Sequence, residues 1–98
     1  MIEKALARLA NGEVPKLFSF ERRFVLKWIL ENLEPGDVHL DHRTSARLHR
    51  LINDETVVYP SDDELRVLMW ACGFEPAYHE DGTWGYKISE KSRIFDKI

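Results

Sequence analysis

Residues 61–89, SDDELRVLMWACGFEPAYHEDGTWGYKIS, predict a capped helix, a helix stop and a β-hairpin. Ser61 can cap the helix, because its hydroxyl can accept a backbone N–H that the first turn leaves unpaired. Glu64 stands three residues later and can bond back to the Ser61 N–H, which completes a capping box. Gly73 follows the apolar run and can adopt the left-handed conformation that ends a helix.

The hairpin has one register that keeps its apolar side chains on a single face. A three-residue loop, Glu80-Asp81-Gly82, with Gly82 at the left-handed bulge position, pairs Tyr78 with Trp84. The same register also pairs His79 with Thr83, Pro76 with Tyr86 and Phe74 with Ile88. A two-residue turn would instead place Tyr78 opposite Gly85 and split the apolar set between the two faces. The proline in the first strand cannot donate to a ladder, so that strand is expected at an edge.

Three helices are expected upstream of this segment. Residues 2–10 predict a short helix that ends at Asn11-Gly12. Residues 20–33, capped by Ser19, are apolar on too many sides for a surface helix, so this helix is expected at the centre of the core with Trp28 buried. Residues 44–53 predict a third helix that stops at Asn53-Asp54.

Shorter segments complete the expected fold. Residues 37–41 could form a brief strand or an extended link, and residues 56–59 have strand propensity up to Pro60. The predicted fold class is α+β: one small domain with three or four helices followed by a C-terminal β-hairpin, the element order of a winged helix. Its expected parts are an N-terminal helix and connector (1–15), a helical core (19–73), the hairpin (74–89) and a tail (90–98) that Ile94 and Phe95 could dock.

Composition favours an ordinary globular protein of the cytoplasm. The 98 residues suit one domain, and the 44% hydrophobic and 32% charged content is typical of a soluble protein. No stretch approaches the roughly 20 apolar residues that a membrane helix needs, and the first residues lack the apolar region of a signal peptide. A single cysteine, Cys72, allows no intramolecular disulfide and fits a reducing compartment.

The net charge of −3 is distributed unevenly along the chain. Residues 1–53 hold nine basic side chains against seven acidic ones, whereas residues 54–81 hold eight acidic side chains and only one basic one, Arg66. Residues 82–98 hold four basic side chains against two acidic ones. An acidic middle between weakly basic ends disfavours a broad phosphate-binding surface.

The favoured functional hypothesis is a small non-enzymatic interaction module that binds another protein, as a regulator or inhibitor. Acidic residues would steer a partner with a basic surface, while aromatic residues beside them would supply most of the binding energy. Carboxylates at a helix start have a structural explanation as well, because they interact favourably with the helix dipole. The candidate protein-binding residues are Asp62, Asp63, Tyr78, Glu80, Asp81 and Trp84.

The alternative hypothesis is a winged-helix-like DNA-binding regulator. Arg43, Arg47 and Arg50 follow at i, i+4 and i+7, so they line one helix face, and a solvated face would explain the same pattern. Together with Lys87 and Arg93 they could contact phosphates. However, the helix before the wing normally enters the major groove with its N-terminal residues. Here that helix begins with three carboxylates, which phosphates repel.

No catalytic, cofactor or metal site is predicted. The five glycines are scattered at turns and form no phosphate-cradling loop. Cys72 with His79 could be considered as a nucleophile and base, but Cys72 lies at the apolar end of a helix without an adjacent cation, which favours a buried structural thiol. The remaining candidates for metal ligation match no standard zinc spacing and have no cysteine pair to complete them: His39, Asp41, His42 and His49.

Overall fold

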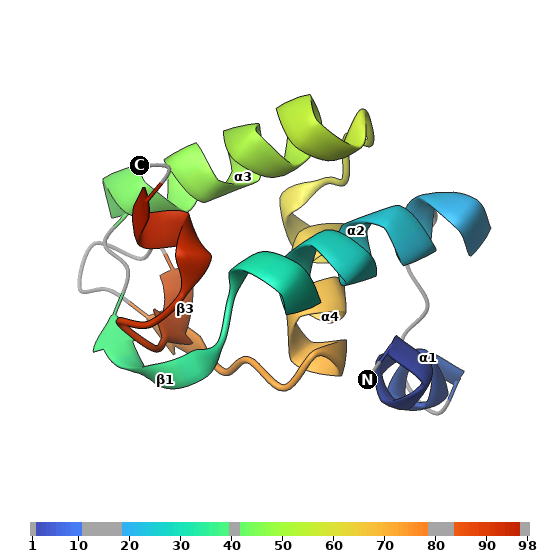
Figure 1. Cartoon of the computed structure of the whole chain (residues 1–98), viewed down its shortest axis with the longest axis horizontal. Coiled ribbons are helices and arrows are strands. Elements are labelled where there is room, and N and C mark those ends of the chain that lie inside the picture. The colour runs from blue at the N-terminus through green and yellow to red at the C-terminus, as the bar shows by residue number, and fades with distance from the viewer. Residues whose placement is uncertain (1, 11–18, 40–41, 79–83, 97–98) are drawn as a thin grey trace.

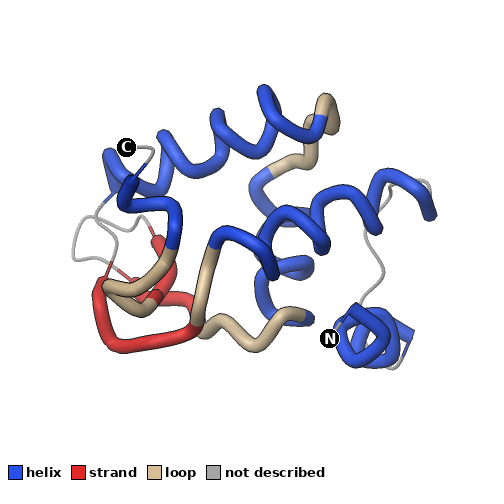
Figure 2. Tube along the Cα trace, in the orientation of Figure 1, coloured by secondary structure: helices blue, strands red, loops and turns tan. Residues whose placement is uncertain are grey.

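The computed structural model describes residues 2–10, 19–39, 42–78 and 84–96. In this part of the chain the structure is α+β, and the helices and strands follow the predicted winged-helix-like order (Figure 1). The sheet and a short 3-10 helix gather at one end of the helical layer, and α1 lies at the opposite end (Figures 1 and 2). The elements are α1 (Ile2–Ala10), α2 (Ser19–Asn32), β1 (Pro35–His39), α3 (His42–Thr56), α4 (Asp62–Ala71), β2 (Pro76–Tyr78), β3 (Trp84–Ile88) and η1 (Arg93–Asp96).

Helix α2 lies at the centre of the fold, as predicted, because it packs against α1, α3, α4 and η1. Val25, Leu26 and Ile29 are completely buried, and Trp28 is only 7% exposed. Not all of its apolar side chains face the core, however, since Phe20 and Phe24 are exposed. No described helix is both long and apolar enough to cross a lipid bilayer.

Helix α3 is longer than its sequence indicated, and the strand expected over residues 56–59 is wrong. The helix continues through Asn53-Asp54 to Thr56, whose hydroxyl donates to the Ile52 carbonyl and accepts the Val58 N–H. Val57 then adopts a φ of 58°, a left-handed conformation that is uncommon for a β-branched residue and that turns the chain toward α4. Strand propensity is overridden here because no described strand pairs with this segment.

The described strands form an antiparallel sheet in the order β1-β3-β2, so β2 is an edge strand as its proline predicted. Tyr78 pairs with Trp84, and Gly85 pairs with Ala77, which confirms the predicted register over the described strands. The Lys87 N–H donates to the Glu75 carbonyl at 3.3 Å and extends the same register by one step. The predicted pairing of residues 79 and 83 lies outside the described residues.

The third strand explains where the hairpin prediction fails. Ile88 was expected to pair with Phe74, but it pairs instead with Pro35 and Val38 of β1, with a bulge between these two. Phe74 precedes β2 and is buried without joining the ladder. The segment for which a strand or a link was predicted is therefore a strand, displaced by two residues toward the N-terminus.

Helix α4 ends as predicted, at a glycine. Gly73 has a φ of 94°, its N–H donates to the Trp70 carbonyl at 2.9 Å, and the Phe74 N–H donates to the Met69 carbonyl at 3.0 Å. These two bonds define a Schellman motif, which pairs the last carbonyls of the helix. The motif turns the chain directly from α4 into the hairpin.

The C-terminal tail is docked rather than loose over its described part. Ser92 is buried, and its Oγ accepts the Glu34 N–H at 2.9 Å, while the Ser89 N–H donates to the Glu34 carbonyl at 2.7 Å. Ile94 of η1 is completely buried in the same hydrophobic cluster as α2 and β3. The tail therefore closes the end of the core next to the sheet.

Candidate functional site at the start of helix α4

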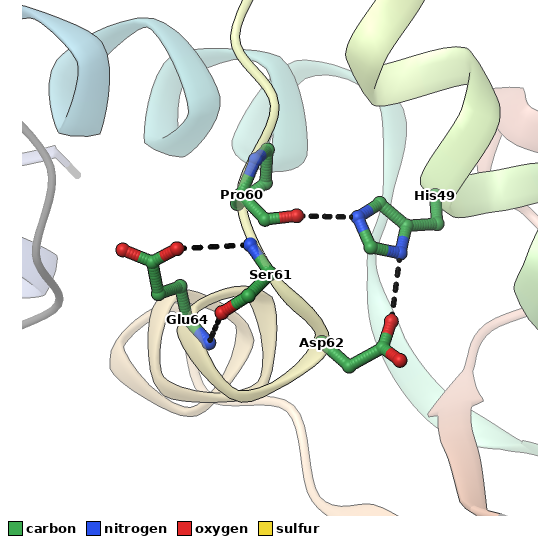
Figure 3. Close-up of polar contacts among 5 residues, drawn as sticks. All are labelled: His49, Pro60, Ser61, Asp62 and Glu64. Atoms are coloured by element: carbon green, nitrogen blue, oxygen red, sulfur yellow. Dashed lines mark hydrogen bonds and ion pairs between the residues drawn. The ribbon is translucent and has the colours of Figure 1, made fainter.

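Figure 3 shows the turn from α3 into α4, where the acidic pair of the favoured hypothesis lies. The predicted capping box is complete: the Glu64 N–H donates to Ser61 Oγ at 3.2 Å, and the Ser61 N–H donates to Glu64 Oε1 at 2.9 Å. Ser61 and Glu64 thus cap the helix without help from Asp62 and Asp63, whose side chains are 81% and 88% exposed. Two carboxylates are displayed to solvent at the positive end of the α4 dipole.

His49 of α3 fixes this turn from the side (Figure 3). Its Nε2 lies 2.7 Å from the Pro60 carbonyl oxygen, and its Nδ1 lies 3.0 Å from Asp62 Oδ1. Both partners are acceptors, so which of the two contacts is a hydrogen bond depends on which ring nitrogen carries the proton. The contact holds one of the two exposed carboxylates against α3.

Arg66 is the basic residue of α4, and it is already engaged. Its Nη2 lies 3.6 Å from Asp63 Oδ1, one turn earlier on the helix. Both side chains are substantially exposed, so this pair contributes little stability. The pair matters for the local charge instead. Because Asp63 lies beside Arg66, it opposes the positive charge of the guanidinium near the start of α4.

Tyr86 of β3 connects the hairpin to this site. Burial raises the pKa of its hydroxyl far above the ordinary value, the Asp62 carboxylate raises it further, and Arg66 opposes the shift. The hydroxyl of Tyr86 therefore lies within electrostatic range of both α4 side chains.

The members of the predicted protein-binding set lie on α4 and on the hairpin. Asp62 and Asp63 are exposed, and the backbones of Tyr78 and Trp84 pair with each other. The side chains of Tyr78 and Trp84 lie outside the described part of the chain. Residues Glu80 and Asp81 of the loop lie outside the described residues entirely.

The predicted basic set comes from three separate elements. Arg47 and Arg50 are exposed on α3, Lys87 is half-buried on β3, and Arg93 is exposed on η1. Arg43 lies in the first turn of α3, and its side chain is outside the described part. The exposed Asp54, four residues after Arg50 on the same helix face, interrupts the positive stripe.

Two structural features near α4 could not be predicted from the residue pattern of a single segment. The Arg8 guanidinium of α1 lies over the Trp70 ring, 4.6 Å from its centroid, at the far end of α4. In the turn before α4, Val57 and Tyr59 are exposed, although their composition had indicated a strand. Both features depend on how distant segments meet, which residue spacing within one helix does not reveal.

The surroundings of Cys72 favour the protonated thiol over the thiolate. Burial raises its pKa from 9.0 to about 12, and Arg8 opposes the shift only partly. The sequence had indicated no cation near this thiol, so Arg8 is a correction supplied by the packing of α1 on α4. A thiol that keeps its proton at pH 7 reacts slowly.

We expect the buried thiol to make the protein sensitive to alkali. The folded-state pKa lies above the unfolded value, so this contribution to stability is intact below pH 9 and is lost as the pH rises toward 12. Between about pH 8 and about pH 10.5, Cys72 should account for up to about 2 kcal/mol of lost stability. Urea unfolding at both pH values should show a smaller loss for Cys72→Ala than for the wild type; equal losses would contradict this.

Among the described residues, no three His, Cys, Asp or Glu side chains are grouped so that they could hold a metal ion. Comparison with protein-family models, curated proteins and solved structures found no match for this chain. The described geometry of the site is a capped helix start with two exposed carboxylates, one of which contacts His49.

Proposed function

We propose that this chain is a small, non-enzymatic protein-binding module of the cytoplasm, which regulates or inhibits another protein by covering a basic surface on it. The observation that carries the proposal is the start of α4. Asp62 and Asp63 are exposed there although capping does not need them, and His49 fixes the position of Asp62. Charge held in place in this way favours complementary partners and speeds their approach.

The hairpin supplies the second part of the proposed surface. Tyr78 and Trp84 pair in the same hairpin, and the neighbouring Tyr86 lies within electrostatic range of the Asp62 carboxylate. Aromatic side chains dominate the binding energy of many protein interfaces, whereas charges at the rim govern steering and selectivity. The proposed binding surface therefore combines Asp62 and Asp63 with the hairpin aromatics and the acidic loop residues Glu80 and Asp81.

The same helix argues against DNA as the primary partner. In a winged-helix DNA-binding protein, α4 would be the helix that enters the major groove. Its first turn carries three carboxylates, Arg66 is already opposed by Asp63, and the Trp70 end is stacked against Arg8 of α1. Phosphates would meet repulsion along the side of the helix that has to approach them.

The test is copurification of the chain from its native organism, followed by direct measurement of the affinity for the partner identified. The double variant Asp62→Lys/Asp63→Lys should weaken binding by about 100-fold or more, since reversal replaces two attractive charges with repulsive ones. The matched control is Glu90→Lys/Asp96→Lys, which makes the same change in net charge at exposed positions outside the site. Equal loss in both double variants, or unchanged affinity in the first, would contradict the proposal.

The alternative, a DNA-binding regulator, keeps one specific observation in its favour. Arg47 and Arg50 are exposed on α3, the helix that precedes α4. They could contact phosphates together with Arg43, Lys87 and Arg93 without placing α4 in a groove. Such binding would weaken steeply as salt rises, which the protein-binding proposal does not require.

A further inference from the structure

Exposed apolar side chains concentrate in two segments of the described structure. Phe20 and Phe24 are 59% and 53% exposed on the first turns of α2, and Val57 and Tyr59 are 75% and 70% exposed in the turn between α3 and α4. These four account for most of the large hydrophobic side chains that are exposed among the described residues. A grouped set of this kind marks an interaction surface more often than a scattered one does.

A hydrogen bond joins the middle of α2 to the end of α3, close to the two segments. The Trp28 Nε1–H donates to Glu55 Oε2 at 3.0 Å, and Glu55 stands two residues before Val57. Phe20, Phe24 and Trp28 follow one another at four-residue intervals, so they form one row along α2. Figure 1 shows the first half of α2 and the end of α3 on the same side of the molecule. We call this the α2–turn surface, made of Phe20, Phe24, Val57 and Tyr59.

The α2–turn surface is held in a fixed shape. The rings of Phe20 and Phe24 meet edge to face, with centroids 6.1 Å apart. On the other side, Thr56 accepts the Val58 N–H and His49 contacts the Pro60 carbonyl, which fix the turn that displays Val57 and Tyr59. Side chains that are ordered before binding lose less conformational entropy when a partner arrives.

Charges of opposite sign lie at the two sides of this surface. Arg23 and Lys27 are exposed on α2 beside the two phenylalanines, and Lys27 makes a long, exposed contact of 3.9 Å with Glu31. Asp54 and Glu55 are exposed at the end of α3 beside Val57. A partner with charges of a single sign would be repelled by one of the two sides. A second copy of the same surface carries both signs, so each side can face a side of opposite charge.

From this pattern we infer that the α2–turn surface binds a second copy of the chain. In a two-fold symmetric pair, each contact occurs twice with the roles exchanged. The basic α2 of each copy then faces the acidic end of α3 in the other, and Phe20 and Phe24 of one copy meet Val57 and Tyr59 of the other. Four exposed side chains make a small contact, so the dimer is weak and reversible.

Sedimentation velocity over roughly 10 to 500 µM protein tests this directly, a range that spans micromolar dissociation constants. The wild type should shift from monomer to dimer as its concentration rises. Phe24→Ser and Tyr59→Ser should each raise the dissociation constant by about tenfold or more. Val38→Ser, which changes an exposed residue outside the surface, should leave it unchanged. A wild type that stays monomeric, or a Val38→Ser effect as large as that of Phe24→Ser, would overturn the inference.

Reversing the charges of one side at a time tests whether the α2–turn surface is the one that forms the dimer. Arg23→Glu/Lys27→Glu makes the α2 side acidic. Asp54→Lys/Glu55→Gln makes the α3 side basic, while the introduced amide oxygen keeps an acceptor for Trp28. Each variant alone should be monomeric, but an equimolar mixture should form the mixed dimer, in which both contacts are attractive again. A mixture that stays monomeric would contradict the arrangement. The inference is independent of the proposed function, since it uses neither Asp62 nor Asp63.

Discussion

Replacing Trp28 with alanine should lower the free energy of unfolding by about 3–5 kcal/mol, the range for large side chains in a core. Trp28 is 7% exposed in the central helix, and its indole N–H is paired with Glu55. Truncation removes a large apolar volume and also leaves the carboxylate without that donor. Urea unfolding followed by circular dichroism measures the loss.

Two further variants separate the volume of Trp28 from its hydrogen bond. Trp28→Phe keeps most of the ring but no N–H, so it should lose roughly 1–2 kcal/mol. Glu55→Gln keeps an acceptor for the indole and should cost less than either change at Trp28. Near-native stability of Trp28→Ala would mean that α2 does not carry the core.

Gly36→Ala should be the most disruptive small substitution in the sheet, with a loss of about 3 kcal/mol or more. A Cβ at this position would lie 2.4 Å from Ser89 Cα and 2.5 Å from Ser89 N. Both are backbone atoms, so β1 and the end of β3 would have to move apart. The Ser89 N–H to Glu34 carbonyl bond, now 2.7 Å, would be the first to lengthen.

The matched control is Gly73→Ala, at the other glycine that the fold constrains. There the φ of 94° is unfavourable, but a Cβ would meet only the Arg8 Nη1 at 4.0 Å. Its cost should be the conformational one alone, about 1–2 kcal/mol. Urea unfolding ranks the two variants, and hydrogen exchange at the Ser89 amide should accelerate only in Gly36→Ala. A Gly36→Ala protein as stable as Gly73→Ala would contradict the close packing of β1 on residue 89.

Local patterns predicted the part of the fold that local physics determines. The capping box, the glycine stop and the hairpin register each depend on residues within a few positions of one another, and all three are confirmed. The bounds and partner of the third strand and the length of α3 differ from what the sequence indicated, because they depend on distant segments. Ile88 pairs with β1, some fifty positions away, and Thr56 extends α3 because no strand is available beside it.

The candidate site likewise combines features that the sequence could predict with features that depend on distant segments. The exposure of Asp62 and Asp63 follows from a capping box that does not need them, so the sequence could predict it. The contact of His49 with Asp62 and the stacking of Arg8 on Trp70 join residues that no spacing rule connects. Phe20 and Phe24 stand in the same four-residue row as the buried Trp28, so spacing alone does not reveal that they are exposed. Only the packed structure shows that α2 extends beyond its neighbours at that end.

Whether the start of α4 excludes DNA is tested most directly by titrating a labelled duplex with the wild type and with Arg43→Ala/Arg47→Ala/Arg50→Ala. The titrations are made at about 50 mM and about 200 mM salt, a range over which three phosphate contacts would weaken binding by about 40-fold. We expect no saturable binding at either salt concentration, and no difference between the two proteins. Saturable binding that falls steeply with salt and disappears in the triple variant would contradict the protein-binding proposal and establish the DNA-binding alternative.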